Sequence, residues 1–211
     1  MNRIAISVFA FLFLAAVSHA KVQDAEFFTV LDENVDEVLA WATGGGGTGE
    51  KISDAYAGDE ALYVASTGGD GQIFNPTVPD WSFSIVENPA GLNEFRYITF
   101  AWKKDGGNGI QLQIHGDPDT WGHRYHAGDN VKGWNPSIQV STSIPTDWTL
   151  ETRDLFGDWG EFTVTGMAFT AWDGNGGAWD FVYFHKSPTP PTAVEPAGKL
   201  ATTWAGLKTT R

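Results

Sequence analysis

The clearest pattern of apolar and polar positions in this chain lies between residues 95 and 119. Residues 95–103 are rich in aromatic and β-branched side chains, which suit a buried, pleated surface. The glycine-rich segment 105–109 supplies the positive φ angles that a tight reversal needs. Residues 110–115 then alternate, so that an apolar set and a polar set point to opposite sides. The apolar set is Ile110, Leu112 and Ile114, and the polar set is Gln111, Gln113 and His115. We expect a hairpin at the border of the core, whose polar face is either plain solvent surface or a ligand surface.

Similar short segments recur along the chain, separated by turn signals. Between residues 24 and 186, only residues 32–41 place apolar side chains at helical spacing. Roughly eight to ten short strands with almost no helix are typical of an antiparallel β-sandwich. The expected strands are residues 24–31, 61–66, 72–74, 81–87, 95–103, 110–115, 122–127, 148–155, 162–172 and 179–186.

The composition supports the same fold class and adds a functional hint. Twenty-five glycines provide many turns, and ten tryptophans with fourteen phenylalanines provide large aromatic side chains for a sandwich or barrel core. Ten tryptophans exceed what one core normally needs. We therefore expect some indoles to be partly exposed, where they serve in recognition.

The two ends of the chain differ from its middle. Arg3, an apolar run over residues 4–17 and the small residues around Ala20 predict a secretory signal peptide at 1–20. The alternative is a membrane anchor, for which this run is short, because a span needs about 20 residues. Residues 21–186 would form the sandwich domain. Residues 187–211 begin as a proline-rich linker and end in a tail, which is either a short docking helix around Trp204 or a disordered segment.

Charge and cysteine content limit the partners. The formal net charge is −13 at pH 7, which disfavours nucleic acid and anionic lipid as partners. After removal of the signal peptide we expect no membrane span. The chain has no cysteine, so an exported protein of this kind, periplasmic, cell-surface or extracellular, relies on packing and on any bound ion rather than on disulfides.

Several segments within residues 61–186 carry a resemblance in combination. They are 95–103 (FRYITFAWK), 109–113 (GIQLQ), 124–128 (RYHAG), Trp134, 145–149 (PTDWT), 153–156 (RDLF), 162–170 (FTVTGMAFT) and 179–183 (WDFVY). Together they resemble a galactose-binding-like jelly roll, and in particular the carbohydrate-binding-module-like domains that are appended to exported bacterial proteins. The resemblance implies a module that binds glycans or holds neighbouring domains together without chemistry of its own. Its site would lie on a concave sheet face or in the loops at one rim.

A glycan site needs a flat aromatic ring for the apolar face of a sugar, and planar amides or guanidinium groups for its hydroxyls. The polar face of residues 111–115 supplies amides, the next strand supplies a guanidinium and a phenol, and nearby loops supply indoles. The alternative is that the two glutamines are merely solvated and that Tyr125 belongs to the core. We expect Trp102 and Trp148 to pack in the core. The candidate ligand-binding residues are Gln111, Gln113, His115, Arg124, Tyr125, Trp121, Trp134 and Trp172.

Carboxylate and histidine side chains are the candidate metal ligands of this chain. The resemblance implies a structural calcium between the first and last strands, held by Asp24 or Glu26 together with Asp180. The alternative for Asp180 is a carboxylate hydrogen-bonded within a turn. A catalytic transition metal is not expected, because His123 and His126 are three apart and face opposite sides of a strand.

No catalytic constellation is evident in the sequence. There is no G-x-S-x-G motif and no cysteine nucleophile, and Glu151 and Asp154 would face opposite sides of one strand. We therefore predict a non-catalytic protein that binds a polysaccharide or glycoconjugate. The alternatives are a structural or protein-interaction module, docking through the C-terminal tail, and a small glycan-active hydrolase or lyase.

Overall fold

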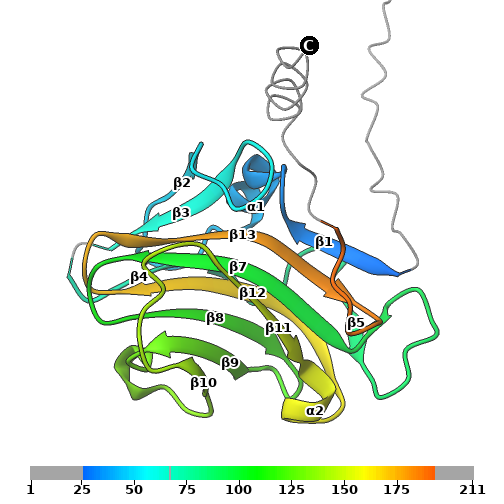
Figure 1. Cartoon of the computed structure of the whole chain (residues 1–211). Helices are drawn as coiled ribbons and strands as arrows, with labels where there is room; N and C mark the ends of the chain where they lie inside the picture. Colours follow the sequence, from blue (N-terminus) through cyan, green and yellow to red (C-terminus); the bar gives the residue numbers. More distant parts are fainter. Residues whose placement is uncertain (1–25, 67, 193–211) are drawn as a thin grey trace, which may run out of the picture.

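The computed structural model describes residues 26–66 and 68–192, which form two β-sheets packed face to face (Figure 1). Sheet A has the strand order β11-β7-β13-β3-β2, with β1 also paired to β13. Sheet B has the order β10-β9-β8-β12-β5-β6, with β4 also paired to β12. The strands of sheet A are β1 (Phe27–Leu31), β2 (Gly49–Ile52), β3 (Ala61–Ala65), β7 (Tyr97–Asp105), β11 (Thr149–Asp154) and β13 (Gly176–His185). Those of sheet B are β4 (Asp70–Asn75), β5 (Phe83–Ile85), β6 (Glu94–Phe95), β8 (Gly109–Gly116), β9 (Thr120–Gly128), β10 (Ile138–Ser141) and β12 (Phe162–Trp172).

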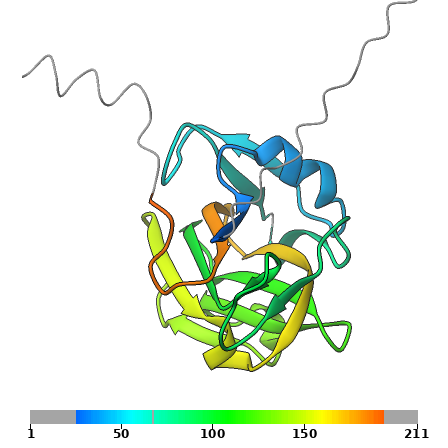
Figure 2. The same cartoon turned by 90° about the vertical axis from the view of Figure 1, so that its right-hand side faces the viewer.

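Helical structure is confined to short pieces. Helix α1 (Val35–Trp41) follows β1 as the apolar spacing predicted, α2 (Leu155–Trp159) follows β11, and the single turn η1 (Val131–Gly133) follows β9. The views in Figures 1 and 2 place α1 with β1–β3 at one end of the molecule and α2 with β9 and β10 at the other. Within the described residues, no helix is long and apolar enough to cross a bilayer.

The predicted β-sandwich is confirmed, with corrections of detail. The described residues contain thirteen strands rather than eight to ten, since β2, β6 and β10 were not expected. The pairs β5–β6 and β9–β10 are parallel, so the sandwich is mostly rather than purely antiparallel. The strand β2 escaped prediction because its sequence, Gly-Glu-Lys-Ile, lacks an apolar alternation; it lies at the edge of sheet A, where polar side chains are common.

The expected hairpin over residues 95–119 is wrong in one respect, because its two strands belong to different sheets. Strand β7 pairs with β11 and β13 in sheet A, whereas β8 pairs with β9 and β12 in sheet B. The glycine turn between them crosses from one sheet to the other. A second crossing lies beside it, between β12 and β13, where a Cβ on Gly107 would approach the Asp173 backbone to 2.4 Å. The buried Lys104 joins both crossings, because its Nζ donates to the carbonyl oxygens of Gly106 (2.6 Å) and Asp173 (2.5 Å).

The main core lies between the two sheets. Trp102, as predicted, packs there with Phe100, at a ring-centroid distance of 4.8 Å, and Trp179 packs against Phe169 at 5.6 Å. The strictly alternating residues of β8 contribute Ile110, Leu112 and Ile114, all fully buried. The apolar sides of β7 and β8 therefore face each other across the sandwich, and not within one sheet.

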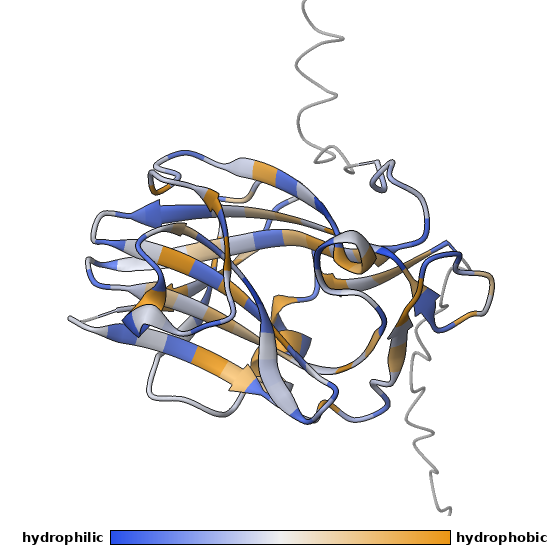
Figure 3. Ribbon diagram, turned by 90° about the horizontal axis from the view of Figure 1, so that it is seen from below, coloured by the Kyte–Doolittle hydropathy of each residue, from blue (hydrophilic) through white to orange (hydrophobic). Residues whose placement is uncertain are grey.

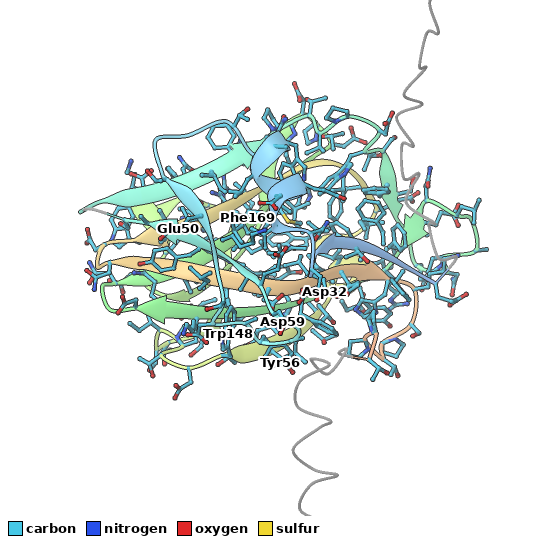
Figure 4. All side chains as sticks on the ribbon, turned by 90° about the horizontal axis from the view of Figure 1, so that it is seen from above. Asp32, Glu50, Tyr56, Asp59, Trp148 and Phe169 are labelled. Carbon is cyan, nitrogen blue, oxygen red and sulfur yellow. The ribbon has the colours of Figure 1, made fainter. Side chains whose placement is uncertain are left out.

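A second, smaller apolar cluster lies between the outer face of sheet A and the segment of residues 53–60, which contributes to it. It contains Ala57, Ala101, Phe181 and Tyr183, with Tyr56 and Trp148 packed against it. The view in Figure 4 shows Tyr56 and Trp148 near one another at one side of this face, with Asp32 and Asp59 beside them. Trp148 was expected in the main core; instead it packs on this cluster, 6.5 Å from the Tyr56 ring.

Asp180 anchors that covering segment. Its Oδ2 accepts hydrogen bonds from the backbone N–H groups of Tyr56 (2.8 Å) and Ala57 (2.9 Å), and its Oδ1 accepts one from Phe181 (2.6 Å). The register of β13 against β7 shifts at this point, and Phe181 has a φ of 53°. Burial raises the pKa of the Asp180 carboxyl to about 6, although the three backbone donors oppose that rise.

Of the carboxylates expected to hold a calcium ion, Glu26 and Asp180 lie among the described residues and Asp24 does not. Glu26 lies opposite Lys186, and Lys186 is six positions along the chain from Asp180. The carboxylates of Glu26 and Asp180 therefore do not converge. Asp180 is instead the hydrogen-bonded carboxylate that was the alternative, and the described part of the chain contains no cluster of three potential metal-ligating side chains. Asp24, the signal peptide at 1–20 and the tail around Trp204 lie outside the described residues.

Candidate functional site

The outer face of sheet B is shaped by a β-bulge that turns Trp121 outward. In the β8–β9 pair, Ile114 lies opposite His123 and Gly116 opposite Thr120, so Trp121 and Gly122 together oppose His115. Strict alternation would put Trp121 on the core side with His123. The extra residue moves it to the outer side, where its ring contacts His115 at 4.8 Å and Phe74 at 5.5 Å.

The floor of this face is a row of hydrogen-bonded polar side chains. Gln113 donates through Nε2 to Thr170 Oγ1 (2.8 Å), and its Oε1 accepts from Arg124 Nε (2.9 Å). His115 Nδ1 is 2.9 Å from Thr165 Oγ1. These bonds hold the amide and the guanidinium in fixed orientations, which is what recognition of a polar ligand requires.

The segment between β9 and β10 forms one wall. Asn130 holds it, because its Nδ2 donates to the Trp134 carbonyl (2.8 Å) and its Oδ1 accepts from Gln111 Nε2 (3.2 Å). Ser137 Oγ bridges to the same Gln111 Nε2 (3.2 Å) and lies 2.7 Å from His126 Nδ1. Gln111 is therefore a fully buried support of this wall, and not a group that meets a ligand directly.

Two indoles and the polar floor enclose a groove of about 310 Å³. Strands of this sheet carry alternating hydrophilic and hydrophobic residues, as the colouring in Figure 3 shows. Arg124 lies 6.0 Å from the Trp134 ring centroid, so the guanidinium and this indole are adjacent. The residues lining the groove are Gln72, Phe74, Gln113, Trp121, Arg124 and Trp134.

Burial sets the charge of the groups on this face. It lowers the pKa of His115 and of His126, so both imidazoles are neutral at pH 7. Burial also lowers the pKa of the Arg124 guanidinium, which nevertheless stays charged because arginine starts so high. The face thus presents one cation among neutral amides, imidazoles and indoles, with the Lys132–Asp70 ion pair at its border.

Five of the eight predicted ligand residues come together in this groove or at its edge. Gln113, Arg124, Trp121 and Trp134 line it, and His115 contacts Trp121 from below. Two others do not reach it. Gln111 lies under the wall, as described, and Trp172 lies half-buried on the same face beside Asp70, outside the set of lining residues.

Tyr125 was wrongly assigned to the ligand face. It is fully buried on the core side of β9, where its hydroxyl donates to Asp158 Oδ2 (2.9 Å). Burial and the Asp158 carboxylate raise its pKa. The alternation of β9 accounts for this, because Arg124 and Tyr125 are neighbours and must face opposite sides.

Two lining residues were missed by sequence reasoning. Gln72 and Phe74 lie on β4, whose pairing with β12 places Gln72 opposite Thr170 and Phe74 opposite Ala168. Their alternation with the buried Gly71 and Ile73 was a signal that this strand has one outward face. Nothing in the sequence, however, indicated that β4 would lie two strands from β8.

Comparisons with known proteins add distant likenesses of fold. No protein-family model and no curated protein matches the chain. Among solved structures, the Endo-D glycoside hydrolase domain from Streptococcus pneumoniae R6 is 17% identical with a TM-score of 0.44, and the match covers 71% of this chain but 22% of that one. This chain therefore spans only a small part of that hydrolase.

Two carbohydrate-binding modules are also similar, the class to which the sequence resemblance pointed. A family 11 module from Clostridium thermocellum, in complex with a β-1,3-1,4-mixed-linked tetrasaccharide, is 13% identical with a TM-score of 0.41, over 72% of this chain and 87% of that one. The module TmCBM61, in complex with β-1,4-galactotriose, is 16% identical with a TM-score of 0.36, over 67% and 88%. At TM-scores below 0.5 these likenesses decide neither a ligand nor an activity.

Proposed function

We propose that this chain binds glycans without catalysis, in the groove on the outer face of sheet B. The observation that carries the proposal is the groove itself, in which Trp121 and Trp134 flank a floor of Gln113 and Arg124. Indole faces suit the apolar C–H surfaces of sugar rings, and amide and guanidinium groups form paired hydrogen bonds with adjacent hydroxyls. A volume of about 310 Å³ fits a short stretch of a glycan chain.

Two further features favour binding over the alternatives. Of the nine tryptophans within the described residues, only Trp102 and Trp179 are buried, which disfavours a purely structural module with all its indoles inside. The residues that line the groove include no carboxylate. The groove therefore lacks the pair of facing carboxylates that a glycosidase uses as acid and base or nucleophile.

The test is a screen over plant, algal and bacterial polysaccharides, followed by calorimetry on the best binder. Trp134→Ala and Trp121→Ala should each weaken binding about tenfold or more, because a stacked indole contributes roughly 1.5 kcal/mol or more. Trp148→Ala is the matched control, since it removes an indole from the opposite face of the sandwich. Silence across the screen, or an equal loss with Trp148→Ala, would contradict the proposal.

A further inference from the structure

Arg124 differs from the other two arginines that the structure describes. Arg96 forms a forked contact with Asp154, with nitrogen–oxygen distances of 2.7–3.1 Å, and Arg153 forms one with Asp158 at 3.0–3.2 Å. Arg124 has no carboxylate partner within the described residues. Its Nε donates to Gln113 Oε1 (2.9 Å) and its Nη1 to the Pro136 carbonyl (3.3 Å), both of which are neutral acceptors.

An unpaired, half-buried cation is unfavourable, since burial removes water from the charge and nothing of opposite sign replaces it. The desolvation shows in the lowered pKa of Arg124, for which no neighbouring charge is a cause. Acidic residues are abundant, because the chain has 26 of them. Three acids act on other groups of this face: Asp70 pairs with Lys132, Asp119 lies 3.6 Å from His115 Nε2, and Asp129 acts on His126.

Arg124 lines the groove and keeps hydrogen-bonding capacity of its own. Its Nη2 has no hydrogen bond to any residue that the structure describes, and the side chain is one of the six that line the groove. A guanidinium whose Nε is held by an amide presents its two terminal nitrogens as a rigid fork. That fork matches the two oxygens of a carboxylate or a sulfate, and such charged hydrogen bonds are about twice as strong as neutral ones.

We propose that the groove is specific for acidic glycans, whose carboxylate or sulfate group supplies the counter-charge that Arg124 lacks. This inference rests on the proposed glycan-binding function and names its substrate class. Trp121 and Trp134 hold the sugar ring, and Arg124 selects the anionic substituent beside it. Lys132, whose Nζ lies 5.6 Å from the Trp134 ring, is paired with Asp70, so Arg124 is the cation left to meet the anionic substituent.

The net charge of −13 works against a polyanion at long range but not at contact. Salt at 0.15 M screens exposed charges beyond about 8 Å, whereas a half-buried contact with Arg124 is screened much less. The affinity should therefore be measured at this ionic strength, where the local contact dominates over the repulsion of the whole surface.

The experiment compares acidic polymers with their neutral counterparts on the same backbone. One pair is polygalacturonate and fully methyl-esterified polygalacturonate, and the other is a sulfated galactan before and after desulfation. Wild-type protein should bind the acidic member of at least one pair roughly tenfold to a hundredfold more tightly, as expected for hydrogen bonds to a charged group. The pair that shows the preference identifies the substituent as carboxylate or sulfate.

Variants then assign the preference to Arg124. Arg124→Gln should remove it, and Arg124→Lys should keep only part of it, because lysine retains the charge but loses the fork. Lys103→Gln is the matched control, since it removes a cation that also lies over an indole, 5.6 Å from Trp148, on the other sheet. Thermal melting and circular dichroism check that each variant is folded, and the wild-type comparison is independent of all of them.

The outcomes separate this proposal from the function on which it rests. Equal affinity for acidic and neutral members of both pairs would overturn acidic specificity and leave glycan binding intact. A preference that survives in Arg124→Gln would also overturn it, because the discrimination would then come from elsewhere. If no polymer of either kind binds, both proposals fall together.

Discussion

Each outer face of the sandwich carries a cation beside an indole, but only the cation on sheet A is paired with an acid. On sheet A, Lys103 lies over the ring of Trp148, at 5.6 Å, and on sheet B, Arg124 lies over the ring of Trp134, at 6.0 Å. Asp54 pairs with Lys103, and it also accepts a hydrogen bond from Trp148 Nε1 (3.2 Å). No described acid does the same for Arg124. A cation beside an indole is therefore not a binding site by itself.

What differs is the chain segment that lies over each face. Residues 53–60 bring Asp54 onto sheet A and place Tyr56 and Ala57 over its apolar cluster, held by the Asp180 carboxylate. On sheet B, the segment between β9 and β10 brings Trp134 to the side of the groove, and its one acid, Asp129, forms no ion pair with Arg124. On sheet A the cation and the indole are hydrogen-bonded to an acid of the same chain, whereas on sheet B the charge of Arg124 and the indoles of Trp121 and Trp134 are available to a ligand.

The largest expected effect tests what keeps sheet A covered. Asp180→Ala would leave three backbone N–H groups near Tyr56, Ala57 and Phe181 without their acceptor. We expect a loss of about 3 kcal/mol in the free energy of unfolding, and a fall of roughly 10 °C in the melting temperature, measured by calorimetry. Asp180→Asn is the control, because it retains one acceptor oxygen and should lose less. A melting temperature unchanged in Asp180→Ala would show that the segment is held by other contacts.

An intermediate effect is expected from giving Arg124 on sheet B an acidic partner, as Lys103 has on sheet A. Gln113→Glu places a carboxylate next to Arg124 Nε in nearly the same shape, and Thr170 Oγ1 can then donate to it. Arg124 would gain the partner that Lys103 already has, so affinity for an acidic glycan should fall by about tenfold or more. Calorimetric titration measures it, with Gln139→Glu on the exposed part of β10 as the charge-matched control. An unchanged affinity would mean that the Arg124 charge has no part in binding.

The smallest effect is expected from removing the acidic partner of Lys103 on sheet A, so that this cation is unpaired like Arg124 on sheet B. Asp54→Asn removes the exposed acid that pairs with Lys103, and exposed ion pairs contribute less than about 1 kcal/mol. Denaturant unfolding should show a loss of stability below that value. No affinity for acidic glycans should appear, because Tyr56 still packs beside Trp148. If the variant gained such affinity, the cover over sheet A would matter less than the acid within it.

Much of the site could be predicted because a strand alternates regardless of its neighbours. The pattern around Gln111, Gln113 and His115 correctly separated the core side of β8 from its outer side. The same rule should have excluded Tyr125, which is adjacent to Arg124 and so faces the core. Trp121 lies on the outer face only because of the bulge opposite His115, and bulges have no reliable signal in a single sequence.

Local residue patterns were enough to predict ten of the thirteen described strands, their apolar and polar sides, the glycine turns and the surplus of indoles. Which strands became neighbours depended on contacts between segments far apart in the chain. A glycine turn such as 105–109 can close a hairpin or cross between sheets with the same apolar alternation, because either arrangement buries Phe100 and Leu112. Only the competition among all strands for partners chose the crossing. It also placed β4 beside β12 and Gln72 and Phe74 in the groove, and it left Arg124 without a carboxylate partner among the described residues.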